Sequence, residues 1–180
     1  LQGLYTELSK ENDQFEIFLA ASDLNNLKKS FSSCSNIKFI KLNSRSKYTR
    51  LAFEIPRLLK KGNYDYAHFT YISPFRKYCK YIVTMHDLLF VDFPSEFPLL
   101  YRLKNYFLFK ISANKADILT TISDFSKKAI ARSFNINDRD IELIRIAVDP
   151  IFFEPYVKDK SKKYILEKYN LQDYIIYVSR

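Results

Sequence analysis

Short apolar runs alternate with helical segments along most of the chain, and this alternation limits the folds open to it. Strands are expected at residues 14–20, 36–42, 64–70, 80–85, 117–122, 140–146 and 174–179. Helices are expected at residues 47–60, 98–115, 123–134 and 161–169. Gly62 is expected just past the end of the first of these helices. Strands that alternate with helices predict an α/β fold, with a parallel sheet and helices on both of its faces.

The chain is short of glycine, which excludes one large group of nucleotide-binding folds. Only Gly3 and Gly62 occur in 180 residues, whereas a dinucleotide fingerprint needs three closely spaced glycines. Two cysteines cannot supply a disulfide framework or a four-ligand zinc site. A hydrophobic content of 47% argues against disorder, and no apolar run is long enough for a membrane span. No export signal is recognisable, so the cytoplasm is the expected compartment.

The basic residues are unevenly spread. The chain carries a net charge of +9, and residues 24–80 hold 13 Lys and Arg against only Glu54 and Asp65. Such a segment attracts the phosphates of a nucleic acid, an anionic lipid or a phosphorylated small molecule, but it also fits a solvated lysine-rich surface. No RNP-type motif, zinc-ligand set or helix-turn-helix spacing accompanies it, which argues against nucleic acid as the partner.

The segment 99–109 is almost entirely apolar or aromatic, and no acid lies between Glu96 and Asp117. Such a helix could lie on an anionic membrane surface. It could equally pack against the sheet while its Lys and Arg side chains reach back to water.

Polar residues follow several of the expected strands, where ligands bind in parallel sheets. The strand ends fall near His68, His86-Asp87, Ser123-Asp124 and Asp149, so both histidines of the chain lie among them. His86 could hydrogen-bond a substrate hydroxyl or phosphate, or merely satisfy loop carbonyls, and Asp87 could cap the following turn. His68 lies between Ala67 and Phe69 and is expected to be packed and hydrogen-bonded. Ser123 is a good helix N-cap whether or not an anion binds there.

Four ordered segments, spread over roughly residues 60–180, resemble the family 4 glycosyltransferases. They are the string TMHDL at 84–88 with Pro94 and Pro98, ADILTTISDFS at 116–126, DIELIRIAVDPIFF at 140–153 and YIIYVSR at 174–180. The nearest resemblance is to mannosyltransferase-like bacterial members that build surface polysaccharides. Two positions depart from the family pattern, since Ile146-Ala147 replaces a common Asn-Gly and Ser179 replaces a glycine.

The resemblance implies a GT-B enzyme, in which two Rossmann-like domains face each other across a cleft. Residues 1–155 would form the acceptor-binding domain without its first strand. Residues 156–180 would be the linker, a helix and the first strand of the donor domain. Members of this family use a nucleotide-sugar donor, retain configuration at the transferred sugar and need no metal. The acceptor would be a glycan or a lipid-linked molecule. A lipid-linked acceptor, with the basic first domain, adds a peripheral position at the inner face of the cell membrane as an option for the cytoplasmic enzyme.

The same resemblance assigns roles to individual residues. His86 and Asp87 would be catalytic, and Gly3, Ser123 and Ser126 would line the acceptor side of the cleft. Gly3 would be the last member of a glycine-rich loop that leads into a helix at residues 4–10. Arg180 would contact the donor diphosphate, and an arginine can grip a diphosphate through two parallel hydrogen bonds.

One alternative function remains open. The chain could be a non-catalytic basic α/β domain that binds anionic partners, either a membrane surface or nucleic acid. Under the enzyme hypothesis, the 180 residues alone should not turn over, because the transition state is assembled from both walls of the cleft.

Overall fold

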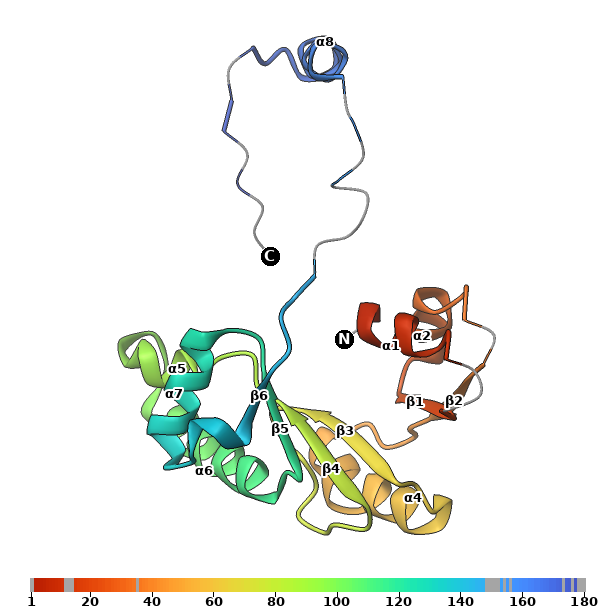
Figure 1. Cartoon of the computed structure of the whole chain (residues 1–180), viewed down its shortest axis with the longest axis vertical. Helices are drawn as coiled ribbons and strands as arrows, with labels where there is room; N and C mark the ends of the chain where they lie inside the picture. The colour runs from red at the N-terminus through yellow and green to blue at the C-terminus, as the bar shows by residue number, and fades with distance from the viewer. Residues whose placement is uncertain are drawn as a thin grey trace. The chain divides into compact units, whose positions relative to one another are not determined.

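The chain forms two compact units, Leu1–Arg145 and Ile146–Arg180 (Figure 1). The computed structural model describes residues 2–11, 15–34, 36–147, 153, 155, 157–172, 174–175 and 177. In the second unit it describes the helix α8 (Lys158–Tyr169), close to the helix expected there. Arg180 and half of the expected strand 174–179 lie outside the described residues, and the domain boundary expected at residue 155 stays a prediction.

The first unit alternates strands with helices, as the sequence pattern predicts. Its first half contains α1 (Gln2–Leu8), β1 (Ile17–Ala21), α2 (Leu24–Ser30), β2 (Ile37–Lys41), α3 (Lys47–Thr49), the π-helical η1 (Arg50–Glu54) and α4 (Ile55–Gly62). Its second half contains β3 (Tyr66–Thr70), β4 (Lys80–Thr84), α5 (Leu89–Asp92), η2 (Pro94–Glu96), α6 (Leu99–Lys115), β5 (Ile118–Thr121), α7 (Asp124–Phe134), η3 (Asp138–Asp140) and β6 (Ile141–Leu143). The expected α/β class is therefore confirmed, while the short helices α2 and α5 were not expected.

Every strand pairing in the described part of the chain is parallel, and the strands form two sheets. One sheet contains β1 and β2, and the other has the order β3-β4-β5-β6. In the larger sheet Thr84 is in register with Thr70 on one side and with Thr120 on the other. The parallel order brings the carboxyl ends of β3, β4 and β5 to one edge of this sheet.

The core of the larger sheet lies on the side of β4 that faces α6 and α7. Tyr81 and Val83 of β4 and Ile130 of α7 are fully buried there, and Phe109 of α6 is buried beside them. Burying one such side chain contributes about 1.5–3 kcal/mol. Leu59 brings α4 into the same core.

Helices also reach the opposite face of this sheet. Successive side chains of a strand point to opposite faces, so His68 lies on the face away from its neighbour Phe69, whose ring packs edge-on against Tyr81. Tyr5 of α1 contacts His68 on that second face. The predicted arrangement of helices on both faces is therefore confirmed. The smaller sheet has a separate core, where Phe31 packs with Ile17 and Ile37.

Helix α4 ends differently from the sequence-based expectation. Gly62 is its last helical residue, and Asn63 adopts the left-handed backbone that ends it, with φ 49° and ψ 50°. Asparagine is one of the few side chains that tolerates this conformation. The Tyr64 ring packs closely over Gly62, and a Cβ atom at this position would overlap the ring unless the ring moved.

The left-handed turn at Asn63 predicts a specific pattern of stability. Asn63→Val should lower the free energy of unfolding by about 1–2 kcal/mol, because a Cβ-branched side chain is strained in that conformation. Asn63→Gly should change it by less than about 0.5 kcal/mol. Urea unfolding followed by circular dichroism measures both changes. Asn114→Val, at an exposed position of α6 with ordinary helical backbone, is the control. A loss for Asn63→Val no larger than for the control would contradict the prediction.

Candidate active site

The candidate site lies where β3, β4 and β5 end. The chain leaves β4 at Thr84 and passes through Met85 to His86 and Asp87. The Met85 N–H donates to the Thr120 carbonyl (2.9 Å), and the Thr121 hydroxyl donates to the Met85 carbonyl (2.7 Å). These two bonds hold Met85 against β5 beyond the last paired residues of the two strands. The backbone that leads into His86 is therefore fixed.

Ser123 and Ser126 hold the next part of this loop. Ser123 is the N-cap of α7, and its Oγ accepts the Ser126 N–H at 3.1 Å. The Ser123 hydroxyl donates to Ser126 Oγ (3.0 Å), and the Ser126 hydroxyl donates to the His86 carbonyl (2.7 Å). The structure therefore brings both serines to His86. Ser126 is buried and its proton is committed to the backbone of the loop.

The Asp87 carboxylate orients the outgoing part of the loop. Its Oδ1 accepts the Leu89 N–H at 3.4 Å, at the start of α5, which matches the capping role that the sequence allowed. Its Oδ2 accepts the Tyr71 hydroxyl at 3.2 Å. Both oxygens are thus engaged by the protein, which fits a group that positions its neighbour.

Tyr71 belongs to this cluster and was missed by the sequence analysis. Its ring stacks on Phe109 with centroids 5.0 Å apart and lies 5.6 Å from the ring of His86. Burial, helped by the charge of Asp87, raises the pKa of its hydroxyl to about 12, so Tyr71 remains a hydrogen-bond donor. No sequence signal marks it, because an aromatic residue just after a strand is ordinary.

The backbone of Tyr71 is unusual. Its φ of 61° is left-handed, and the other described non-glycine residues with positive φ are all asparagines. The Ile72 N–H closes a tight turn onto the Thr70 carbonyl (2.7 Å), and the Tyr71 N–H donates to the Thr84 carbonyl (3.0 Å). Such strain costs about 1–3 kcal/mol and persists only where surrounding contacts impose it.

The His86 imidazole is the group that the cluster leaves available. It is half-buried beside Tyr71, and it makes no hydrogen bond to any residue that the structure describes. Its backbone carbonyl, by contrast, is fixed by Ser126. A ring on a fixed backbone, with available nitrogen atoms, can accept or donate a hydrogen bond to a substrate hydroxyl.

His68 has no such freedom. The Tyr5 hydroxyl lies 2.6 Å from its Nδ1, and the Thr84 hydroxyl lies 2.6 Å from its Nε2. A further 2.6 Å contact joins Thr84 Oγ1 to Thr120 Oγ1. Burial raises the pKa of Tyr5 to about 12 and lowers the pKa of His68, so this chain of bonds fits a neutral imidazole that accepts from Tyr5 and donates to Thr84. The expectation that His68 is packed and hydrogen-bonded is confirmed.

Gly3 and Arg180 are the two remaining candidate residues. Gly3 lies in α1, and a Cβ atom there would meet nothing within 4 Å, so the local backbone does not require glycine. Arg180 lies outside the described residues. The roles assigned to both stay predictions, as do those of His86, Asp87, Ser123 and Ser126.

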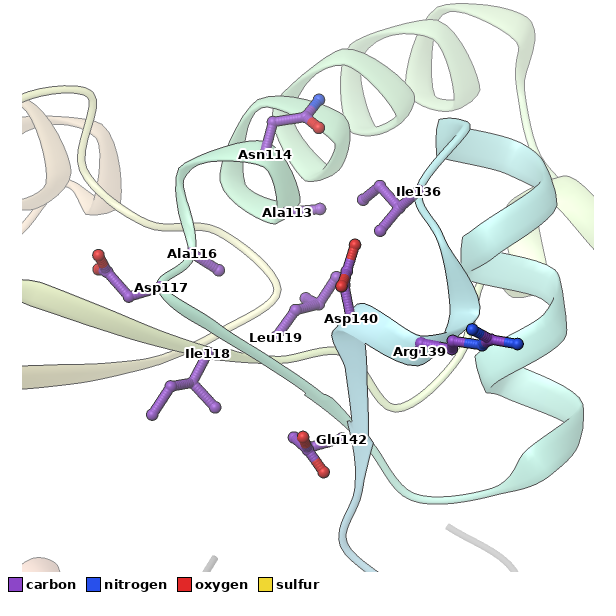
Figure 2. Close-up of a pocket in the computed structure, with 10 residues that line it drawn as sticks. All are labelled: Ala113, Asn114, Ala116, Asp117, Ile118, Leu119, Ile136, Arg139, Asp140 and Glu142. Atoms are coloured by element: carbon purple, nitrogen blue, oxygen red, sulfur yellow. The ribbon is translucent and has the colours of Figure 1, made fainter.

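A cavity of about 470 Å³ lies at the other end of β5, near its first residues (Figure 2). Its lining includes Asp117, Arg139, Asp140 and Glu142, but their side chains do not converge on one point (Figure 2). Asp117 is already paired with Lys77 at 2.6 Å, which lowers the pKa of its carboxyl. Among the described residues, no group of three or more His, Cys, Asp or Glu side chains could hold a metal ion. This cavity is therefore not the candidate site.

The lowered pKa of His68 predicts a loss of stability in mild acid. The ordinary pKa of histidine is about 6.5. Below that pH, His68 takes up a proton in the unfolded chain but resists it in the folded chain. The stabilisation should thus be complete above about pH 7 and fall as the pH drops through about 6.5. Thermal melts from about pH 7 down to pH 5.5 should show this decline in the unchanged chain. The decline should be strongly reduced in His68→Gln and retained in His86→Gln. An equal decline in His68→Gln would contradict the assignment.

The Ser126 hydroxyl predicts a second stability effect. Ser126→Ala leaves the His86 carbonyl without its donor and should cost about 1–3 kcal/mol of unfolding free energy. Ser133→Ala, on the same helix at a half-buried position, should cost less than about 0.5 kcal/mol. Denaturant unfolding of both variants provides the comparison, and equal losses would mean that the bond to His86 contributes nothing.

Comparison with known proteins identifies the family. A model described as Glycosyltransferase Family 4 matches residues 2–152, which contain the whole candidate site. Among curated proteins, none matches this sequence. The match covers most of the chain and agrees with the parallel α/β fold of its first unit. The chain belongs to the family 4 glycosyltransferases.

Proposed function

We propose that the protein transfers a hexose, with mannose as the first candidate, from a nucleotide-sugar to a glycan or lipid-linked acceptor. The reaction would retain configuration at the transferred sugar, need no metal ion and serve surface polysaccharide synthesis. Family membership over residues 2–152 supports glycosyl transfer. The observation that carries the choice of site is the His86 imidazole, available at the carboxyl edge of the larger sheet.

In this proposal the first unit supplies the acceptor side of the active site. The bond between the anomeric carbon and the donor diphosphate breaks, and a bond from that carbon to an acceptor oxygen forms. The acceptor proton leaves with the diphosphate. His86 would hydrogen-bond a hydroxyl of the reacting sugar, which positions the anomeric carbon, while Asp87 and Tyr71 hold the loop. Arg180 would hold the leaving diphosphate through paired hydrogen bonds.

The direct test is a transfer assay. The intact enzyme is incubated with a panel of nucleotide-sugars and with glycan or lipid-linked acceptors, and release of the nucleoside diphosphate is measured together with the product. Turnover with one donor, unchanged by a metal chelator, is the expected result. No turnover with any donor and acceptor pair would contradict the proposal. The 180-residue chain by itself is predicted to be inactive in the same assay.

Replacing His86 should damage catalysis without unfolding the protein. His86→Ala in the intact enzyme should lower kcat at least about tenfold, as expected for a positioned acid–base or hydrogen-bonding group. Asp140→Asn, at the cavity on the opposite end of β5, should leave kcat unchanged. An unaltered kcat in His86→Ala would reduce His86 to a loop residue without a catalytic role.

A second candidate function, a non-catalytic domain for anionic partners, is favoured by one observation. Several cations of the basic segment 24–80 are exposed, among them Lys28, Lys29, Lys41 and Arg45. Binding to random-sequence RNA tests it, because a phosphate-binding surface loses affinity steeply as salt rises. Salt-sensitive binding near the micromolar range at physiological salt would favour this function over sugar transfer.

A further inference from the structure

Helix α6 has two apolar sides, and only one of them faces the core. Phe109 and Ala113 lie on the inner side and are buried against the larger sheet. Five exposed apolar side chains lie on the outer side, at helical spacing after an adjacent first pair: Leu99, Leu100, Leu103, Phe107 and Ile111. We call these five residues the outer stripe. Leu100 is 80% exposed and Phe107 60% exposed, so the stripe presents apolar side chains to solvent.

Lysines border the outer stripe on both sides. On a helix of 3.6 residues per turn, Lys110 falls on one border and Lys104 on the other, while Lys115 at the end of the helix donates to the Phe75 carbonyl. Lys104 lies 4.6 Å from the ring centroid of Tyr48 and donates to its hydroxyl. The sequence from residue 97 to 116 contains no acid, so nothing on the helix offsets these charges.

Of the two interpretations that the sequence left open for this helix, packing against the sheet describes its inner side. The inner side packs against the sheet, while the outer stripe is more apolar than a solvent-facing helix surface usually is. Exposed apolar patches of this kind, rimmed by polar groups, mark interaction sites. None of the described helices combines the length and hydropathy of a membrane span.

We propose that the outer stripe docks on an anionic membrane surface. The apolar side chains would enter the boundary between headgroups and acyl chains, and Lys104 and Lys110 would contact lipid phosphates. A second copy of the chain fits this surface less well, because two facing stripes would bring the lysines of both copies together.

Docking through α6 also fits the position of the candidate site. Phe109, on the inner side of α6, stacks on Tyr71, which in turn contacts Asp87. One layer of side chains thus separates the stripe-bearing helix from the site loop. This link to a lipid-linked acceptor rests on the proposed function, whereas docking itself needs no sugar transfer, so the two can fail separately.

Vesicle flotation of the full 180-residue chain tests the proposal. The probes are phosphatidylcholine vesicles with and without phosphatidylglycerol, at low and high salt. The chain should float with the anionic vesicles and lose most of this binding at high salt. Leu100→Ser combined with Phe107→Ser should weaken binding at least about tenfold, because two exposed apolar anchors are removed. Lys104→Gln and Lys110→Gln should each weaken it about fivefold.

Matched variants separate docking from general stickiness. Phe125→Ser changes an α7 phenylalanine that is 66% exposed, and Lys60→Gln with Lys61→Gln changes exposed lysines of α4. These variants should bind as the unchanged chain does, and all variants should keep the same melting temperature. Equal loss in the control variants, or equal binding to neutral vesicles, would overturn the proposal. A dimer in analytical ultracentrifugation that disappears in the stripe variant would overturn it in favour of a second copy.

Discussion

Strand β4 is paired in parallel on both edges, and the rest of the first unit is arranged around that pairing. Thr84, its last residue, shows how much depends on it. Its carbonyl accepts from the Tyr71 backbone, its hydroxyl lies between the His68 Nε2 and the Thr120 hydroxyl, and the chain then turns into the His86 loop. A shift of one residue in the register would turn Thr84 toward the apolar core and Val83 away from it. The polar network and the site loop therefore depend on the same ladder.

The site separates support from chemistry. Buried hydroxyls and backbone groups hold the loop: Ser126 fixes the His86 carbonyl, and Thr121 fixes that of Met85. The left-handed backbone at Tyr71 is offset by the stacking of its ring on Phe109 and by its bond to Asp87. The imidazole of His86 is held by none of these bonds. Rigid support around an imidazole that is available for hydrogen bonding is what the role proposed for His86 requires.

Much of this arrangement follows from local rules that a sequence displays. Alternating apolar runs predict the strands, and parallel order predicts that His86 and Ser123 meet at one edge. Other features depend on contacts between distant residues. Two such features are the overlap that a Cβ atom at position 62 would make with Tyr64 and the backbone strain at Tyr71. Both arise only in the packed structure. The exposure of Leu100 and Phe107 likewise depends on which side of α6 packs against the sheet. Helical spacing alone does not decide this, because α6 is apolar on both sides.

The division of the strands into two sheets has a practical consequence. In the described part of the chain, β1 pairs on one edge only, and so does β3. Unpaired N–H and C=O groups along a strand are a template for another strand, and natural edges often carry lysine, proline or a bulge to prevent such pairing. Neither IFLAA in β1 nor YAHFT in β3 contains lysine or proline. The isolated chain is therefore expected to associate edge to edge as its concentration rises, and a peptide that occupies these edges would act as its solubiliser.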